Sequence, residues 1–430
     1  MAMIATMKNG KEKLHNLCAG RAGAPRGMPE PVPPTPDAAL PPARRLRRTL
    51  MLLPSRGFGG TERHSLALMA ALMEAGCAVA CAAAPELHPA LLAAWPGREP
   101  PDLRPADLAW HPGRTAESHA AQHHATRALL ADGTPDVAVL PLPWPEAGLG
   151  CLRALAETGQ PSLAIGHLAP RQRAFLPLDD AGQRDAARLV GGWVAVSAPV
   201  RAGLAWRFAL PEATIALVPN GARPPAGGDR AGRRARVRQD LGLAPGTRLA
   251  LFLGRLDPAK GADLLPDIAR RLAAGPPAVL AVAGAGAPPT LEAALRRAAR
   301  GDNPPLRLLG FRQDAGALLE AADALLLPSR LEGYPLAFLE AALRRCPVVA
   351  SEAALEGLGE EAAEVACLVP TGDAAALATA LATVLRGGAE VARRQAAAEA
   401  LALRQDEAAM CARYLGLLRG VLLGSTGAAR

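Results

Sequence analysis

Short apolar runs followed by helical patterns recur along most of the chain. Residues 50–54 form the first such run, which leads through the glycines at 57, 59 and 60 into a helical pattern and then into a second run at 78–84. Apolar runs of this length are typical of strands buried on both faces of a parallel sheet. Each strand–helix–strand repeat is a βαβ unit, so the repeats predict a sheet covered by helices on both faces.

The same pattern occurs in two series. Further strands of the first series are expected at residues 137–141, 162–166, 192–197 and 214–219. Residues 222–234 are rich in proline, glycine and arginine and lack periodicity, which is typical of a linker. Strands of the second series are expected at residues 248–253, 278–283, 306–309, 324–327 and 347–350.

The sequence therefore predicts an α/β protein with two facing, Rossmann-like, doubly wound parallel-sheet domains and a cleft between them. Ligands of such sheets bind beyond the carboxyl ends of the strands, so the cleft is the expected site. The predicted parts are a disordered Pro-rich basic extension at 1–48, a first domain at 49–222, a linker at 223–245, a second domain at 246–402, and a helix at 403–430 that returns to the first domain.

The net charge of +8 belongs mostly to the extension, because residues 1–49 hold nine Lys and Arg but three acidic residues. With 3% aromatic residues, the chain is also poor in side chains that stack on bases. We therefore expect no nucleic-acid partner. Eight prolines in residues 22–42 favour disorder, and the alternative is a weak tether to anionic lipid.

Cysteine spacing and hydropathy bear on the compartment. None of the seven cysteines forms a Cys-x-x-Cys motif, so we interpret them as reduced, mostly buried thiols of a cytosolic protein. The sequence contains no run of 18 uninterrupted apolar residues, which argues against a membrane-spanning helix. The first 15 residues lack a signal-peptide core.

The most informative constellation spans residues 329–340. A predicted strand ends, Glu332 and Gly333 follow in a loop, and a helix with Pro335 at its start carries Glu340. The free N–H groups of such a helix start suit an anion or a hydroxyl oxygen, and the two carboxylates could accept hydrogen bonds from sugar-like hydroxyls. The alternative is that Glu332 caps the helix and Glu340 makes a surface pair.

Two cations lie in the loop of residues 254–261, between a predicted strand and helix. Arg255 supplies a planar fork and Lys260 a compact charge, and together they suit a diphosphate. The loop lacks the residue order of a Walker motif. A solvated basic loop is the alternative.

Weaker candidates come from the first series. Gly59 and Gly60 lie in a loop where a ligand could approach the backbone closely, although a plain turn is the alternative. His167 ends a strand, a location that points toward the cleft, and a satisfied structural histidine is the alternative. His119, His123 and His124 are an unconvincing metal cluster, and without an Asp-x-Asp motif we expect no metal site.

Taken together, these motifs resemble the retaining glycosyltransferases of family 4, which have the two-domain GT-B fold. Residues 59–63 resemble the family's Gly-Gly-x-Glu-Arg loop, and residues 253–261 resemble its Gly-Arg-Leu-x-x-x-Lys-Gly loop. Residues 327–351 resemble its Glu-x7-Glu signature. The resemblance covers residues 50–423 approximately.

The resemblance implies roles for the candidate residues. Arg255 and Lys260 would hold the diphosphate of a nucleotide-sugar donor, Glu340 the ribose hydroxyls, and Glu332 the donor sugar. The remaining donor-side positions are Gly59, Gly60 and His167 around the sugar, Gly333, Tyr334, Pro335 and Leu336 beside Glu332, and Phe311 and Arg312 near the base.

The activity implied by the resemblance is transfer of a sugar to a glycan or lipid-linked acceptor in cell-envelope polysaccharide biosynthesis. Family members need neither a cofactor nor a metal, and the departing phosphate takes the acceptor proton on the same face of the sugar. We expect a cytoplasmic protein with peripheral contact at the inner membrane face. The alternatives are a GT-B nucleotide-sugar epimerase and a catalytically silent glycan-binding module.

Two departures from the family pattern stand out. Where the family has Cys-Gly-x-Pro after the signature helix, this chain has residues Arg344 to Pro347, which leaves the end of that helix uncertain. After Asn220 and Gly221 an aspartate is common, whereas Ala222 stands here. We expect the second departure to affect the crossover between domains or the acceptor side.

Overall fold

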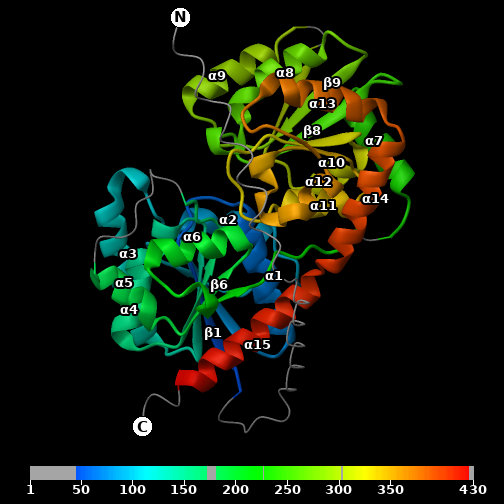
Figure 1. Ribbon diagram of the computed structural model, residues 1–430. Helices are drawn as coiled ribbons and strands as arrows, with labels where there is room; N and C mark the ends of the chain where they lie inside the picture. The colour runs from blue at the N-terminus through cyan, green and yellow to red at the C-terminus, as the bar shows by residue number, and fades with distance from the viewer. Residues whose placement is uncertain (1–44, 172–180, 226, 302–303, 426–430) are drawn as a thin grey trace, which may run out of the picture. The chain divides into compact units, whose positions relative to one another are not determined.

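The computed structural model describes residues 45–171, 181–225, 227–301 and 304–425 (Figure 1). The chain divides into a unit of residues 1–41, which lies outside the described residues, and a compact unit of residues 42–430. The extension predicted at 1–48 lies almost wholly outside the described residues, because the description begins at Arg45 and the first strand begins at Arg48.

A seven-stranded parallel sheet forms from the first half of the chain, with the strand order β3-β2-β1-β4-β5-β6-β7. Its strands are β1 (Arg48–Leu53), β2 (Ala78–Ala83), β3 (Asp102–Pro105), β4 (Val137–Leu142), β5 (Ser162–Gly166), β6 (Gly192–Ala195) and β7 (Ile215–Leu217). All residues of β4 and β5 are buried, as expected of central strands covered on both faces.

The second half forms a six-stranded parallel sheet in the order β10-β9-β8-β11-β12-β13. Its strands are β8 (Arg248–Leu253), β9 (Ala278–Ala283), β10 (Leu306–Gly310), β11 (Ala324–Leu327), β12 (Val348–Ser351) and β13 (Cys367–Val369). The order reverses beside β1 and β4 in one sheet and beside β8 and β11 in the other. Crevices at the carboxyl ends of strands form at such points, and the prediction of two doubly wound sheets is confirmed.

Helices connect and cover the strands (Figure 1). In the first half they are α1 (Gly60–Glu74), α2 (His88–Ala93), α3 (Thr115–Asp132), α4 (Leu149–Thr158), α5 (Ala181–Leu189) and α6 (Ala198–Phe208). In the second half they are α7 (Arg230–Asp240), α8 (Leu265–Leu272), α9 (Pro289–Ala298), α10 (Ala315–Ala321), α11 (Leu336–Leu343), α12 (Ala362–Val365), α13 (Ala374–Arg386) and α14 (Ala389–Arg404). The last helix, α15, spans Glu407–Ser425.

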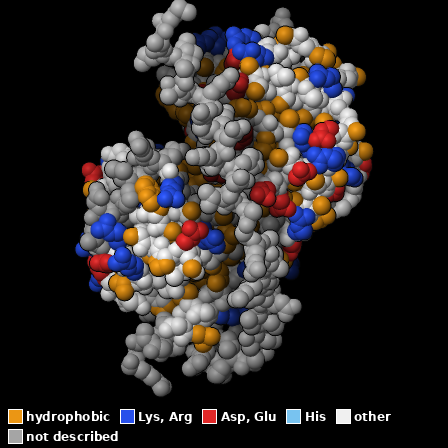
Figure 2. Space-filling model, viewed as in Figure 1, with side chains coloured by type: hydrophobic (Ala, Val, Ile, Leu, Met, Phe, Trp, Pro, Cys, Tyr) orange, Lys and Arg blue, Asp and Glu red, His pale blue; other side chains and the backbone are white. Residues whose placement is uncertain are grey.

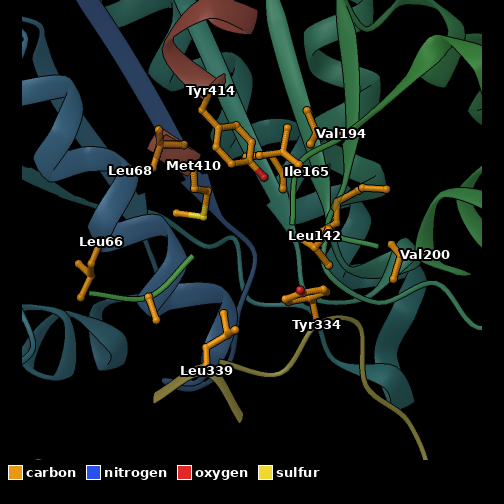
Figure 3. Close-up of a cluster of buried hydrophobic side chains, with 14 of the residues drawn as sticks. Leu66, Leu68, Leu142, Ile165, Val194, Val200, Tyr334, Leu339, Met410 and Tyr414 are labelled. Atoms are coloured by element: carbon orange, nitrogen blue, oxygen red, sulfur yellow. The ribbon is translucent and has the colours of Figure 1, made fainter. Parts of the chain in front are cut away.

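Helix α15 packs against α1, β4 and β5 of the first half, although it comes last in the chain. Its buried face carries Met410, Tyr414 and Leu418, of which Tyr414 and Leu418 are fully enclosed. Figure 3 shows Met410 and Tyr414 in one apolar cluster with Ile165 of β5. The side chains of α15 therefore complete the core of the first sheet.

Helix α7 lies inside the segment 223–245 that the sequence predicts as a linker. None of its residues is buried, so apolar periodicity gives no sign of it. Its arginines hold it instead: Arg233 pairs with Glu320 at 2.7 Å, and Arg234 pairs with Asp323 at 2.6 Å. Arg234 also donates to the carbonyl oxygen of Ala321 at 2.7 Å, at the end of α10. Long-range ion pairs thus anchor α7 to the second half, in place of a buried apolar face.

The departure at residues 344–347 has a visible structural cost. Helix α11 ends at Leu343, and Arg345 adopts a left-handed conformation with φ of 52°. This position corresponds to the glycine of the family pattern, and an L-amino acid with a side chain is strained there. The Arg345 guanidinium pairs with Glu399 of α14 at 3.1 Å, which ties the turn to a neighbouring helix.

Three further observations concern the described part of the chain. Six cysteines of the described part are free thiols, and five of these are buried. Among the described residues, no single helix is long and apolar enough to span a membrane; α13 and α14 meet that criterion only as a pair, bent by 95° at their junction. Charged side chains on the face in Figure 2 form mixed groups of basic and acidic residues.

Candidate functional site

The loop after β8 contains both predicted cations. The Asp257 carboxylate accepts a hydrogen bond from the backbone N–H of Lys260 at 2.9 Å, which closes a short turn. The next residue, Gly261, has φ of +69°, and a Cβ there would lie 2.2 Å from the carbonyl oxygen of Pro328. Only glycine satisfies both conditions, so the β8 loop lies directly against the loop after β11.

Lys260 and Glu332 meet across these two loops. The Lys260 ammonium lies 2.6 Å from Oε1 of Glu332, and the hydroxyl of Ser329 donates to the same oxygen at 2.9 Å. Both charged side chains are largely enclosed, with 23% and 11% of their surface exposed. Glu332 does not cap α11, which begins after Pro335 without a side-chain cap, so the capping alternative is wrong.

A second link between the loops was not anticipated from the sequence. The Arg330 guanidinium makes two bonds to the Asp263 carboxylate at 2.6 and 2.8 Å, and the Arg330 backbone N–H donates to the carbonyl oxygen of Ala259 at 2.7 Å. This paired geometry fixes one loop against the other. Arg330 lies inside the signature segment, but no local pattern reveals a partner 67 positions away.

Arg255 is placed differently from Lys260. Its side chain is 60% exposed, and its nearest acidic partner is Asp257 at 3.2 Å. Its charge also acts on Glu62 of the first half, where it opposes the rise in carboxyl pKa that burial causes. Arg255 is therefore the more accessible of the two predicted phosphate ligands, and it lies within electrostatic reach of the first glycine loop.

The backbone around Gly333 packs tightly against the first half. A Cβ on Gly333 would lie 1.9 Å from the carbonyl oxygen of His167, so only glycine fits. The Asn220 side chain donates to the carbonyl oxygen of Tyr334 at 2.7 Å in a buried position. Figure 3 shows Tyr334 beside Leu142 of the first sheet. The start of α11 is thus held by loops from the carboxyl ends of β4–β7.

Helix α11 begins at Leu336, and its N-cap residue is Pro335. No side chain of the N-cap residue accepts a hydrogen bond from the first turn of the helix. The first N–H groups of any helix lack intrahelical partners, and they lie at the positive end of its dipole. The predicted segment from Gly333 to Leu336 therefore presents its backbone beside Glu332.

The glycine loop after β1 leads into α1. Gly59 caps the helix, and its N–H donates to the buried Glu62 carboxylate at 2.6 Å. A Cβ on Gly60 would have no atom within 4 Å, so the space beside it is open. Arg63 of this helix pairs with Glu340 at 2.7 Å, with 44% and 19% of the two side chains exposed. Glu340 therefore has an ion-pair partner, as the surface-pair alternative proposed.

His167 lies at the carboxyl end of β5, and its backbone N–H donates to the carbonyl oxygen of Leu142 at 3.0 Å. Its ring meets that of His64 edge to face, with centroids 4.8 Å apart. Burial, and then the neighbouring His64, lowers the pKa of His167 well below its ordinary value. Its imidazole is consequently neutral at pH 7.

The two predicted base contacts lie after β10, at the edge of the second sheet. Phe311 is 55% exposed, which is unusual for a large apolar side chain. Arg312 bonds to Asp314 at 2.7 and 2.5 Å, and this pairing raises the pKa of its guanidinium. Phe311 therefore presents a free ring face, whereas Arg312 is already engaged.

Two of the three histidines set aside as a metal site make separate contacts. His119 bonds to the carbonyl oxygen of Glu146 at 2.9 Å, and His123 bonds to Glu157 at 2.7 Å. Within the described ranges, no group of three or more His, Cys, Asp and Glu side chains is placed to hold a metal ion. That the activity does not require a metal ion stays a prediction.

Two family matches cover most of this architecture. Residues 58–224 match the family described as Glycosyltransferase Family 4, and residues 247–387 match Glycosyl transferases group 1. The chain belongs to the family 4 glycosyltransferases. The resemblance and the prediction of a glycosyltransferase are thereby confirmed.

Curated relatives carry the same activity class. A phosphatidyl-myo-inositol mannosyltransferase of Mycobacterium leprae is 30% identical over 290 residues, which cover 66% of this chain and 73% of the relative. A D-inositol 3-phosphate glycosyltransferase of Segniliparus rotundus is 32% identical over 129 residues, which cover 29% of each protein. The chain thus spans under a third of this second relative.

Solved structures show the GT-B fold. Anabaena HepE in complex with UDP and glucose has a TM-score of 0.66 at 19% identity, covering 85% of this chain and 97% of that one. The sucrose-phosphate synthase of Thermosynechococcus elongatus has a TM-score of 0.67 at 19% identity, covering 89% and 100%. At this identity the similarity establishes the fold of this family 4 glycosyltransferase.

Proposed function

We propose that the protein is a retaining glycosyltransferase that moves a sugar from a nucleoside-diphosphate donor to a hydroxyl of a glycan or glycolipid. The observation that carries this proposal is the Lys260–Glu332 pair, which sits where the loops of two neighbouring strands, β8 and β11, meet the start of α11. The donor is also supported by HepE, which was solved with UDP and with UDP-glucose.

The donor diphosphate is an anion, and three features of the site suit it. Arg255 is exposed and offers a planar fork, Lys260 supplies an ammonium, and the helix start of α11 supplies N–H groups. In this proposal the Lys260 ammonium, already paired with Glu332, bridges that carboxylate and the phosphate. Glu332 then accepts hydrogen bonds from donor-sugar hydroxyls, and Phe311 offers its ring face to the base.

The transfer breaks the bond between the anomeric carbon and the phosphate oxygen and forms a bond from that carbon to the acceptor oxygen. The acceptor hydroxyl proton passes to the leaving phosphate on the same face, which retains the configuration and releases a nucleoside diphosphate. Negative charge grows on the phosphate oxygens as the bond breaks. Fixed cations and helix N–H groups stabilise that charge more in the transition state than in the ground state.

No cofactor or metal takes part in this scheme. The chain's own cations replace the ion that neutralises the diphosphate in metal-dependent transferases. Turnover unchanged by a chelator, and not raised by added Mg²⁺ or Mn²⁺, is the expected result. Loss of turnover with a chelator that Mg²⁺ restores would contradict it.

The acceptor side is proposed to face the first sheet, around Gly59, Gly60 and His167. A lipid-linked acceptor fits a cytoplasmic protein that contacts the inner membrane face through the nine basic residues of positions 1–49. Co-sedimentation with vesicles containing anionic lipid tests this contact. Equal sedimentation of the full chain and of a chain lacking residues 1–48 would remove the role of the extension.

The decisive experiment is release of nucleoside diphosphate from a panel of UDP-, GDP- and ADP-sugars with glycan and lipid-linked acceptors. A thermal-shift screen of the free nucleoside diphosphates selects the base first, because a ligand that binds the native state raises the melting temperature. Analysis of the product anomer then tests retention. An inverted product would contradict the mechanism while leaving the transferase activity intact.

A further inference from the structure

The buried face of α15 reaches the donor loop at Gly333 and Tyr334 by two separate chains of contact. Met410 and Tyr414 lie four positions apart, so they project from the same face of the helix, one turn from each other. Figure 3 draws both side chains directed from α15 into the cluster that contains Tyr334 and Leu339. Neither residue belongs to a motif that carries the resemblance.

The first chain of contact consists of three rings. The ring of Tyr414 meets that of His64 edge to face with centroids 5.1 Å apart, and His64 meets His167 in the same way at 4.8 Å. The carbonyl oxygen of His167 then lies against the Cα of Gly333, so closely that no Cβ fits. A shift of Tyr414 would therefore propagate through His64 and His167 to the donor loop.

The second chain of contact runs through residues 220 and 221. The Gly221 N–H donates to the thioether sulfur of Met410 at 3.1 Å. Its neighbour Asn220 donates to the carbonyl oxygen of Tyr334 at 2.7 Å. The turn that leaves the first sheet is thus held between α15 on one side and the donor loop on the other.

The three rings are poor choices if their only task is to fill the core. His64 is 2% exposed and Tyr414 is fully buried, yet the hydroxyl of Tyr414 and both ring nitrogens of His64 have no hydrogen-bond partner in the described structure. At position 64, leucine or phenylalanine would fill the same volume without desolvating two ring nitrogens. The costly imidazole of His64, between the rings of Tyr414 and His167, points to a role in the site.

We propose that His64 and Tyr414 are positioning residues, which fix His167 and through it the donor loop at Gly333 for sugar transfer. This inference rests on the proposed function, since it concerns the same loop. Neither side chain is assigned contact with the donor. Their removal is expected to lower the rate of transfer more than the affinity for nucleotide, because Arg255 and Phe311 lie outside this chain of contacts.

The test compares Tyr414→Leu with Leu418→Ala. Leu418 is equally buried, lies one turn further along α15 and belongs to the same core, so Leu418→Ala is a matched control for lost packing. Both variants are assayed at a temperature well below their melting points. We expect Tyr414→Leu to lower kcat by about 10-fold with the donor KM changed by less than about 2-fold, whereas Leu418→Ala leaves kcat within about 2-fold of the parent.

Two further variants sharpen the result. Tyr414→Phe keeps the ring and is expected to restore kcat to near the parent value. In the double variant His64→Leu with Tyr414→Leu, the loss is expected to be smaller than the product of the two single losses, because both residues act through His167. Equal losses in Tyr414→Leu and Leu418→Ala, or multiplicative losses in the double variant, would overturn the inference. A parent protein that transfers no sugar from any donor would overturn the proposed function instead.

Discussion

The carboxyl edges of the two sheets are built from polar groups in opposite ways. In the second sheet the charged groups are paired with one another, as in Lys260 with Glu332 and Arg330 with Asp263. In the first sheet, within the part of the chain that the structure describes, one oxygen of Glu62 and the Nε2 atom of His167 are buried and have no hydrogen-bond partner.

This difference indicates how each side meets its ligand. A site of paired charges is organised before the donor arrives, so little reorganisation accompanies the growth of charge in the transition state. Buried polar groups without partners are costly in the free protein, and they gain hydrogen bonds when a ligand or water enters. We therefore expect changes on the donor side to affect catalysis and changes on the other side to affect both stability and catalysis.

The largest expected effect follows removal of either partner of the donor-side pair. Lys260→Ala and Glu332→Ala should each lower turnover by at least ~100-fold, as loss of one preorganised transition-state contact does. Steady-state release of nucleoside diphosphate measures this. Arg296→Ala on α9, which removes an exposed arginine paired with Glu292, is the control and should keep near-parent turnover. Near-normal turnover in both site variants would remove the assignment.

Gly333→Ala should break the junction between the two edges. Its Cβ would lie 1.9 Å from the carbonyl oxygen of His167, so one backbone must shift, at an expected cost in unfolding free energy of about 3 kcal/mol. Gly60→Ala is the matched control, because a Cβ there meets no atom within 4 Å. Urea unfolding of both variants compares them. Equal stabilities would show that the 333 loop is free to move.

The buried histidines of the first edge should make stability depend on pH. Burial lowers the pKa of His64 to about 4. His64 therefore binds a proton near pH 6.5 in the unfolded chain, but only near pH 4 in the folded protein. Stability from His64 is therefore complete above pH 6.5 and is lost as the pH falls toward 4. Between pH 7 and pH 5 this amounts to about 2 kcal/mol.

The control for this pH dependence is His64→Phe, whose ring does not titrate. The parent should lose about 2 kcal/mol more than this variant between pH 7 and pH 5, measured by urea unfolding. In both proteins, His167 also makes the free energy of unfolding fall as the pH falls, because burial lowers the pKa of its imidazole. Glu62 has the opposite effect on the free energy of unfolding, because burial raises the pKa of its carboxyl group. Parallel stability curves for parent and variant would show that His64 is accessible to protons in the folded state.

The smallest expected effect lies outside both edges. Arg345→Gly should raise the unfolding free energy by about 1 kcal/mol, because Arg345 has φ of 52° and glycine adopts this conformation without strain. The lost pair with Glu399 is half-exposed and contributes little. Arg344→Gly, at φ of −100°, is the control and should destabilise the protein. A fall in stability for Arg345→Gly would mean that the pair with Glu399 outweighs the strain.

Much of the fold could be predicted from local pattern. Strands β8 and β9 span the predicted residues because each is an apolar run bounded by glycine or proline. The edge strand β3 was not predicted, since its four residues are only partly buried and carry no apolar run. Helix α7 was not predicted because long-range ion pairs, rather than an apolar stripe, hold it in place.

For the candidate site, too, local sequence patterns predict the loops but not the long-range contacts. The loops of Lys260 and Glu332 could be placed near each other because parallel strands end at one edge. The Arg63–Glu340 pair joins residues 277 positions apart, and the His64–His167 contact joins helix α1 to the residue that follows β5. No local periodicity encodes such pairings. They follow only from tertiary packing, within the first half for the two histidines and between the halves for Arg63 and Glu340.

The place of α15 in the sequence has a consequence for biosynthesis. Residues 407–425 leave the ribosome after both sheets, yet Tyr414 and Leu418 fill the interior of the first sheet. Until they arrive, the nascent first half exposes the apolar surface of β4 and β5 that α15 covers. The nascent chain therefore exposes this apolar surface from the synthesis of β5 until α15 emerges, and the first half acquires its final stability only when the last helix is in place.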